Sequence, residues 1–201
     1  MTIKHKNAAE DACERSDYGE AGRLYTLAAY DSLSKCDFPD PESVTTGTYI
    51  GLAMYCFQNA AFAFHLAGDE TRCENRVEQA ILIIKDFEEY TFHYDALRGL
   101  AREAIGDLKL IRGNETAAAN EYEIASDRYA TVTETGWLAE SIFEWSFEFF
   151  REIMDDAGDP VSVEKQTSML DSFDERIKTK REKLPNGLET VTETGSYTPG
   201  S

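Results

Sequence analysis

Apolar residues recur along the chain every three or four positions, which is the period of an amphipathic helix. The alternation typical of strands is nearly absent, so the sequence predicts an all-α fold. Glycine, proline and capping side chains divide the pattern into eight helices. We expect these helices at approximately 4–15, 18–35, 45–67, 70–90, 92–112, 115–131, 134–156 and 160–184.

The breaks between helices carry their own signals. Gly68-Asp69, Gly113-Asn114 and Gly158-Asp159-Pro160 each pair a helix-ending glycine with a capping side chain or proline for the next start. Pro185-Asn186-Gly187 is expected to end the last helix, and the residues beyond it show no core-forming period. The sequence thus predicts one helical domain over 1–184 and a mobile C-terminal tail over 185–201.

A pattern of small, large and small residues repeats three times. It consists of Ala21, Tyr25 and Ala28, then Cys73, Val77 and Ala80, then Ala118, Tyr122 and Ala125. This spacing places the three side chains on one helix face, where small residues allow a neighbouring helix to approach and the large one fills the gap. The pattern is typical of helical hairpins that bury their apolar faces by stacking on one another.

The segment from Asp17 to Ala28 resembles the second-helix motif of the tetratricopeptide repeat (TPR) family, and Gly106 falls where that family places a first-helix glycine. The resemblance covers residues 1 to about 130. It departs from the family in its repeat spacing and in lacking the closing prolines. The resemblance implies stacked antiparallel helical hairpins, a TPR-like α-solenoid that binds a protein or peptide. The alternative fold is a generic helical bundle.

In this family the first helices of the hairpins line the binding groove. Carried over residue by residue, the resemblance implies groove positions at Lys6, Glu10, Cys13, Tyr55, Gln58, Phe62, His65, Glu103 and Asp107. The alternative for Tyr55, Phe62 and His65 is that they are packed core. A rival function is a small ligand-binding protein or enzyme with a pocket near Tyr55, Gln58 and His65.

The chain has a formal net charge of -18, which argues against nucleic-acid binding because phosphates require positive counter-charge. The acidic residues are spread through predicted helices, chiefly 37–90 and 131–160, and this distribution favours a salt-rich cytoplasm that screens self-repulsion. The first residues show cations without an apolar segment, so we expect no secretory signal. The most apolar stretch contains Gln58, Asn59 and His65, and we expect no membrane association. The four cysteines include no C-x-x-C pair and are expected to be reduced.

Signals of catalysis are weak. The three histidines, His5, His65 and His93, lie in three different predicted helices, and no metal-binding, phosphate-binding or nucleophile motif is present. The sequence therefore favours a non-catalytic binding protein with no catalytic residue, metal or cofactor.

The predicted helix 134–156 carries an acidic row at Glu140, Glu144, Glu148 and Glu152. Like charges four residues apart repel one another, so another interaction must offset the repulsion within the row. Three alternatives remain open: the row is a solvated face, it pairs with the cations of the last helix, or it is a docking site for a basic partner. The same helix is rich in Phe and Trp, which leaves homodimerisation through it as a further hypothesis.

Overall fold

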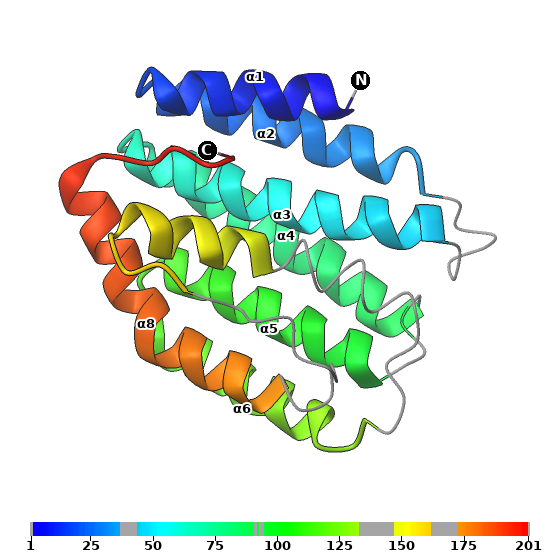
Figure 1. The fold of residues 1–201 in the computed structure, drawn as a ribbon. Coiled ribbons are helices and arrows are strands. Elements are labelled where there is room, and N and C mark those ends of the chain that lie inside the picture. Colours follow the sequence, from blue (N-terminus) through cyan, green and yellow to red (C-terminus); the bar gives the residue numbers. More distant parts are fainter. Residues whose placement is uncertain are drawn as a thin grey trace.

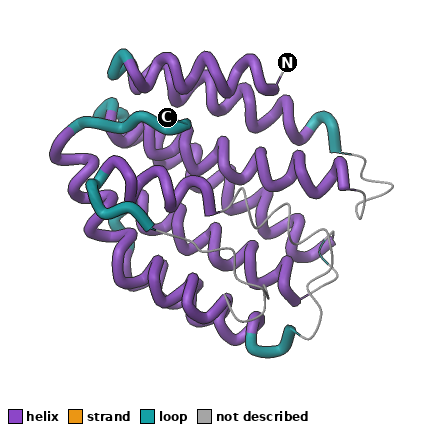
Figure 2. The backbone as a smooth tube through the Cα atoms, viewed as in Figure 1, coloured by secondary structure: helices purple, strands orange, loops and turns teal. Residues whose placement is uncertain are grey.

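The computed structural model describes residues 2–36, 44–90, 92, 95–132, 147–161 and 173–200. Within these ranges the chain is helical with no strand, which confirms the all-α prediction (Figure 2). The helices are α1 (Thr2–Glu14), α2 (Tyr18–Leu33), α3 (Val44–Leu66), α4 (Glu70–Tyr90), α5 (Asp95–Ile111), α6 (Glu115–Tyr129) and α8 (Phe173–Thr194). A further helical segment covers 147–156.

The helix ends follow the predicted caps. The Asp17 side chain accepts a hydrogen bond from the Glu20 amide and the Asn114 side chain accepts one from the Ala117 amide, so each caps the helix that follows. Gly68 and Gly113 both have a φ of +70°, a conformation that favours glycine and ends α3 and α5. Local chemistry thus sets where these helices stop.

Consecutive helices from α1 to α6 pack against one another, each along its neighbour (Figure 1). All nine residues of the repeated small-large-small pattern are buried on α2, α4 and α6. A Cβ added to Gly106 would lie 2.6 Å from the Tyr122 ring, so the ring of the third repeat occupies the space that the glycine leaves. The repeat therefore marks the buried face of every second helix.

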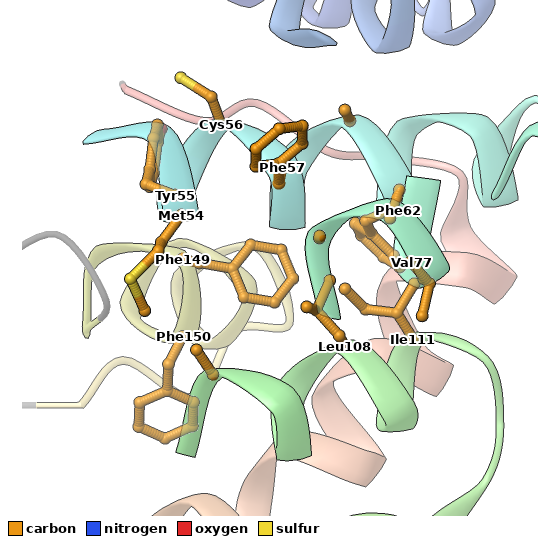
Figure 3. Packing of buried hydrophobic residues seen from close by; sticks show 14 of the residues in the cluster. Met54, Tyr55, Cys56, Phe57, Phe62, Val77, Leu108, Ile111, Phe149 and Phe150 are labelled. Carbon is orange, nitrogen blue, oxygen red and sulfur yellow. The ribbon is translucent and has the colours of Figure 1, made fainter. Parts of the chain in front are cut away.

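The core continues from α3 into the segment 147–156. Tyr55, Phe57 and Phe62 of α3 are buried, as are Phe149 and Phe150, and Figure 3 shows these rings in the apolar core together with Leu108 of α5. Because the side chains of Phe149 and Phe150 are fully buried in this core, they are not available to a dimer interface. Phe147 is half-buried against the same core. The other residues on which the dimer hypothesis depends, Trp137, Phe143 and Trp145, lie outside the described residues.

The last helix differs from the prediction. α8 continues through Pro185 to Thr194, so the predicted mobile tail over 185–201 is wrong for the described residues up to Gly200. Leu184, Leu188 and Val191 are buried at helical spacing, and their burial offsets the hydrogen bond that Pro185 cannot donate. α8 packs on α6 and α5. No helix among the described residues is both long and apolar enough to cross a membrane.

Candidate binding groove

Two acids predicted to line the groove are instead completely buried. Glu103 and Asp107 lie on α5, one turn apart, and each has no exposed surface. Lys180 of α8 lies 2.7 Å from a Glu103 oxygen and 2.6 Å from an Asp107 oxygen, and Arg176 Nε donates to Glu103 at 2.6 Å. Among the described residues, two carboxylates therefore face two cations in a buried cluster, which we call the ionic cluster.

Neutral side chains complete the hydrogen bonds of the ionic cluster. The hydroxyl of Tyr129 donates to Glu103 at 2.8 Å, and the hydroxyl of Tyr122 donates to Asp107 at 2.6 Å. Gln58 of α3 donates to the other Asp107 oxygen at 2.9 Å. Buried charges require such partners, because desolvation without them costs several kcal/mol.

The positive charges of Arg176 and Lys180 determine whether the pKa of Glu103 rises or falls. Burial on its own would raise the pKa of this carboxyl, but Arg176 and Lys180 outweigh that effect and hold the pKa below its usual value. For Asp107, burial raises the pKa, and the negative charge of Glu103 adds to the rise while Lys180 opposes it. Glu103 is thus the firmly ionised member of the cluster.

Burial also settles the choice that the sequence left open for α3. Tyr55, Gln58 and Phe62 have at most 1% of their surface exposed and belong to the core. Tyr55 and Gln58 therefore form no pocket with His65, and Phe62 reaches the surface only at the edge of the groove described below. α8 and the residues after it cover the face that the TPR resemblance assigns to a ligand. The sequence prediction is wrong here because it ends the last helix at residue 184 and leaves 185–201 as a mobile tail that covers nothing.

The C-terminal segment 195–200 covers the other end of that face (Figure 1). The hydroxyl of Tyr197, a fully buried residue, donates to the Asn59 side chain of α3, and its ring lies edge-on to Phe62 at a centroid distance of 5.1 Å. Thr198 donates to Asp156 from its amide at 2.8 Å and from its hydroxyl at 2.9 Å. An extended piece of the chain thus binds across α3 and the segment 147–156.

The first predicted groove residues lie close to this segment. Lys6 and Glu10, half-buried on α1, form an ion pair, and the Lys6 ammonium lies 5.4 Å from the centre of the Tyr55 ring. A Cβ on Gly200 would meet the Glu10 carboxylate at 2.6 Å. Glu10 therefore contacts the chain's own C-terminal end. Cys13 is buried one turn further along α1.

The acidic row does not behave as one surface. Glu140 and Glu144 lie outside the described residues, and Glu148 pairs with Arg151 of its own helix. Glu152 is buried and accepts a hydrogen bond from the Tyr55 hydroxyl at 2.8 Å. Burial raises the pKa of Glu152 to about 8, while the Tyr55 hydrogen bond opposes the rise and the Glu148 charge adds to it. The two described members therefore do not pair with α8, and Glu152 belongs to the core.

An accessible groove borders α8. It lies between the C-terminal ends of α3 and α5, the start of α6 and the later part of α8, with a volume of about 460 Å³. Phe62 and His65 from the predicted set line it, with Phe62 contributing only its 1% of exposed surface. Its ionisable lining residues besides His65 are Glu115, Glu189 and Glu193, which we call the acidic groove residues. No lysine or arginine is among the described residues that line the groove.

The sequence analysis missed all three acidic groove residues. Glu115 begins α6, and Glu189 and Glu193 lie one turn apart on the part of α8 that the sequence predicts to be a tail. The spacing of Leu184, Leu188 and Val191 was the available signal, because it continues the helix far enough to place both acids on it.

The described thiols are poor nucleophiles. All four cysteines are unpaired with one another, as the sequence predicted. Burial raises the pKa of Cys13 to about 12 and that of Cys36 and Cys73 to about 11, and it also raises the pKa of Cys56. Since the thiolate is the reactive form, these groups are unsuited to nucleophilic catalysis at neutral pH.

No protein-family model matches this chain, and no curated protein or solved structure matches it either. The resemblance to TPR proteins therefore stays a prediction.

Proposed function

We propose that this chain is a non-catalytic binding protein whose accessible groove takes a basic segment of a partner protein or peptide. The proposal rests on the negative charge of the groove lining. Glu115, Glu189 and Glu193 are exposed and have no ion-pair partner among the described residues. Lysine or arginine side chains on an occupant would supply the missing positive charges, and electrostatic complementarity would select such a partner.

The proposed scaffold is a divergent TPR-like stack of helical hairpins. Its support is the packing of consecutive helices from α1 to α6 and the burial of the repeated pattern on α2, α4 and α6. In this proposal α8 and the C-terminal segment fill much of the concave face. The groove beside α8 is the surface that this proposal assigns to a partner.

A groove for an extended segment is also consistent with how the chain binds its own C-terminus. Tyr197 inserts its ring beside Phe62 while Thr198 is held through its amide and hydroxyl. Phe62 contacts this segment and also lines the groove. A partner peptide in the groove would lie next to the chain's own C-terminal segment and could use the same combination of ring contacts and hydrogen bonds.

A small-molecule ligand is the second candidate. The groove volume of about 460 Å³ lies within the range of ligand pockets, roughly 300–1,000 Å³. The same three carboxylates would then require a cationic ligand. We further propose a salt-rich cytoplasm as the setting that suits the net charge of -18.

Selection from a random peptide library tests the proposal. The chain is immobilised at low ionic strength, and binders are counter-selected on a variant that carries Glu115→Gln, Glu189→Gln and Glu193→Gln. We expect enrichment of peptides rich in lysine and arginine that the variant does not retain. Enrichment of apolar or acidic sequences would contradict a basic occupant. If no peptide is enriched but small organic cations bind the chain and not the variant, the ligand-binding candidate replaces the peptide one.

A further inference from the structure

Three side chains with metal-binding atoms meet at the turn between α3 and α4. They are His65 at the end of α3, Glu70 at the start of α4 and Cys73 one turn later. One donor atom from each lies within 4.8 Å of the other two. The sequence alone does not reveal this cluster, because the Gly68 turn brings the three residues together from positions that match no metal-binding motif.

The His65 imidazole holds one of the three donor atoms. Its Nδ1 is buried and makes no hydrogen bond among the described residues, and a Glu70 oxygen lies 3.3 Å from it. The Phe62 ring stacks on the imidazole at a centroid distance of 6.1 Å and an interplanar angle of 18°. A buried nitrogen that makes no hydrogen bond is unfavourable unless something binds it.

We propose that His65, Glu70 and Cys73 form a binding site for a divalent zinc ion. Thiolate, imidazole and carboxylate are the three donor types that zinc accepts in proteins. One thiolate and one carboxylate also neutralise the two charges of the ion. Three protein ligands leave a fourth position for water.

The geometry requires little movement. Around a tetrahedral zinc ion the donor atoms stand roughly 3.3–3.7 Å apart, given metal–ligand distances of about 2.0–2.3 Å. The Glu70 side chain is 73% exposed and can rotate toward the other two donors, while Cys73 and the His65 nitrogen are already held in place by burial. The exposed carboxylate also leaves a route by which the ion can enter.

Neighbouring cations do not oppose the ion strongly, because each has its own acid. Arg112 pairs with Glu74 and Glu78, and Arg72 pairs with Asp69 at 3.4 Å. The bound ion would connect α3 to α4 across the turn. Because the unfolded chain does not hold these donors together, zinc would stabilise the folded state.

Calorimetric titration of the chelator-treated chain with zinc chloride tests the site. We expect one equivalent to bind and the unfolding temperature to rise. With cobalt(II) we expect a thiolate-to-metal charge-transfer band that Cys73→Ser abolishes. Glu70→Gln should weaken zinc binding by about 100-fold, at least as much as loss of an outer-shell partner.

Matched controls separate this site from adventitious binding. Cys36→Ser and His5→Ala remove the same kinds of donor elsewhere and should leave zinc binding unchanged. Glu70 is exposed, so the Glu70→Gln variant stays informative even if Cys73→Ser does not fold. Absence of stoichiometric binding, or equal binding by the wild type and Glu70→Gln, would overturn the proposal. Failure to bind a basic peptide would leave it untouched.

Discussion

The hydroxyl of Tyr197 donates a hydrogen bond to the side chain of Asn59, which lies 138 positions earlier in the chain. Asn59 in turn donates to the Tyr55 carbonyl of its own helix at 3.0 Å. Both residues are fully buried. The C-terminal segment is therefore part of the core, and it covers a face that a helical repeat protein would otherwise offer to a ligand.

This relationship predicts that the C-terminal segment stabilises the fold. Replacing Tyr197 by Ala removes a fully buried ring and its hydrogen bond, and we expect a loss of about 3–5 kcal/mol in the free energy of unfolding. Urea denaturation measures the change. Ser196→Ala is the control, because Ser196 is exposed next to it. Equal stability of the two variants would mean that the segment is not anchored.

The ionic cluster predicts that replacing Lys180 lowers the free energy of unfolding far more than replacing the nearby Lys183. Lys180→Met leaves Glu103 and Asp107 buried with one cation fewer, and we expect a loss of about 3–5 kcal/mol. Lys183→Met breaks only a surface pair with Asp159 and should cost about 1 kcal/mol or less. Denaturation of both variants checks the difference. Similar losses would show that Lys180 is not buried between the carboxylates.

Glu152 predicts a pH dependence of stability. Its pKa rises from 4.5 to about 8 on folding, chiefly through burial, so the folded chain holds a proton that the unfolded chain releases. The contribution of this group is fully present below about pH 4.5 and is lost as the pH rises through 8. Glu152→Gln stays neutral, so its stability relative to the wild type should increase between pH 5 and pH 8.

Denaturation at both pH values measures this change. Glu123→Gln is the control, since Glu123 is exposed on α6 and should show no such increase. If Glu152→Gln shows the same pH profile as the wild type, the carboxyl is ionised in the folded chain.

Gly106 predicts a steric effect. An added Cβ would lie 2.6 Å from the buried Tyr122 ring, whose hydroxyl is bound to Asp107, so the ring cannot move away freely. We expect Gly106→Ala to cost roughly 1–3 kcal/mol. Gly19→Ala is the control, because nothing lies within 4 Å of the added carbon, and it should not destabilise α2. Thermal unfolding distinguishes the two.

Local patterns explain which features could be predicted. The small-large-small repeat and the capping residues Asp17 and Asn114 act within one or two turns, so the sequence reveals them directly. The contact between Lys180 and Asp107 spans 73 positions, and nothing local shows that a lysine on one helix and an aspartate on another are both buried. The prediction from sequence places such charges in solvent or along the groove, because charged side chains are seldom buried.

The end of the last helix is predicted wrongly for a different reason. Proline disfavours a helix interior by about 3 kcal/mol, so the sequence predicts a helix end at Pro185. The burial of Leu184, Leu188 and Val191 outweighs this local preference. The groove could not be recognised without the extra turns of α8, since two of its three carboxylates lie on them.

The affinity of the chain for a selected lysine- and arginine-rich peptide, measured by fluorescence anisotropy at low ionic strength, tests the proposed function most directly. We expect the variant with Glu115→Gln, Glu189→Gln and Glu193→Gln to bind about tenfold more weakly, as loss of three exposed charge pairs at about 0.5 kcal/mol each implies. The control variant with Asp11→Asn, Glu14→Gln and Glu123→Gln changes the net charge equally at exposed positions outside the groove. It should keep the wild-type affinity, and equal weakening of both variants would contradict a basic ligand in this groove.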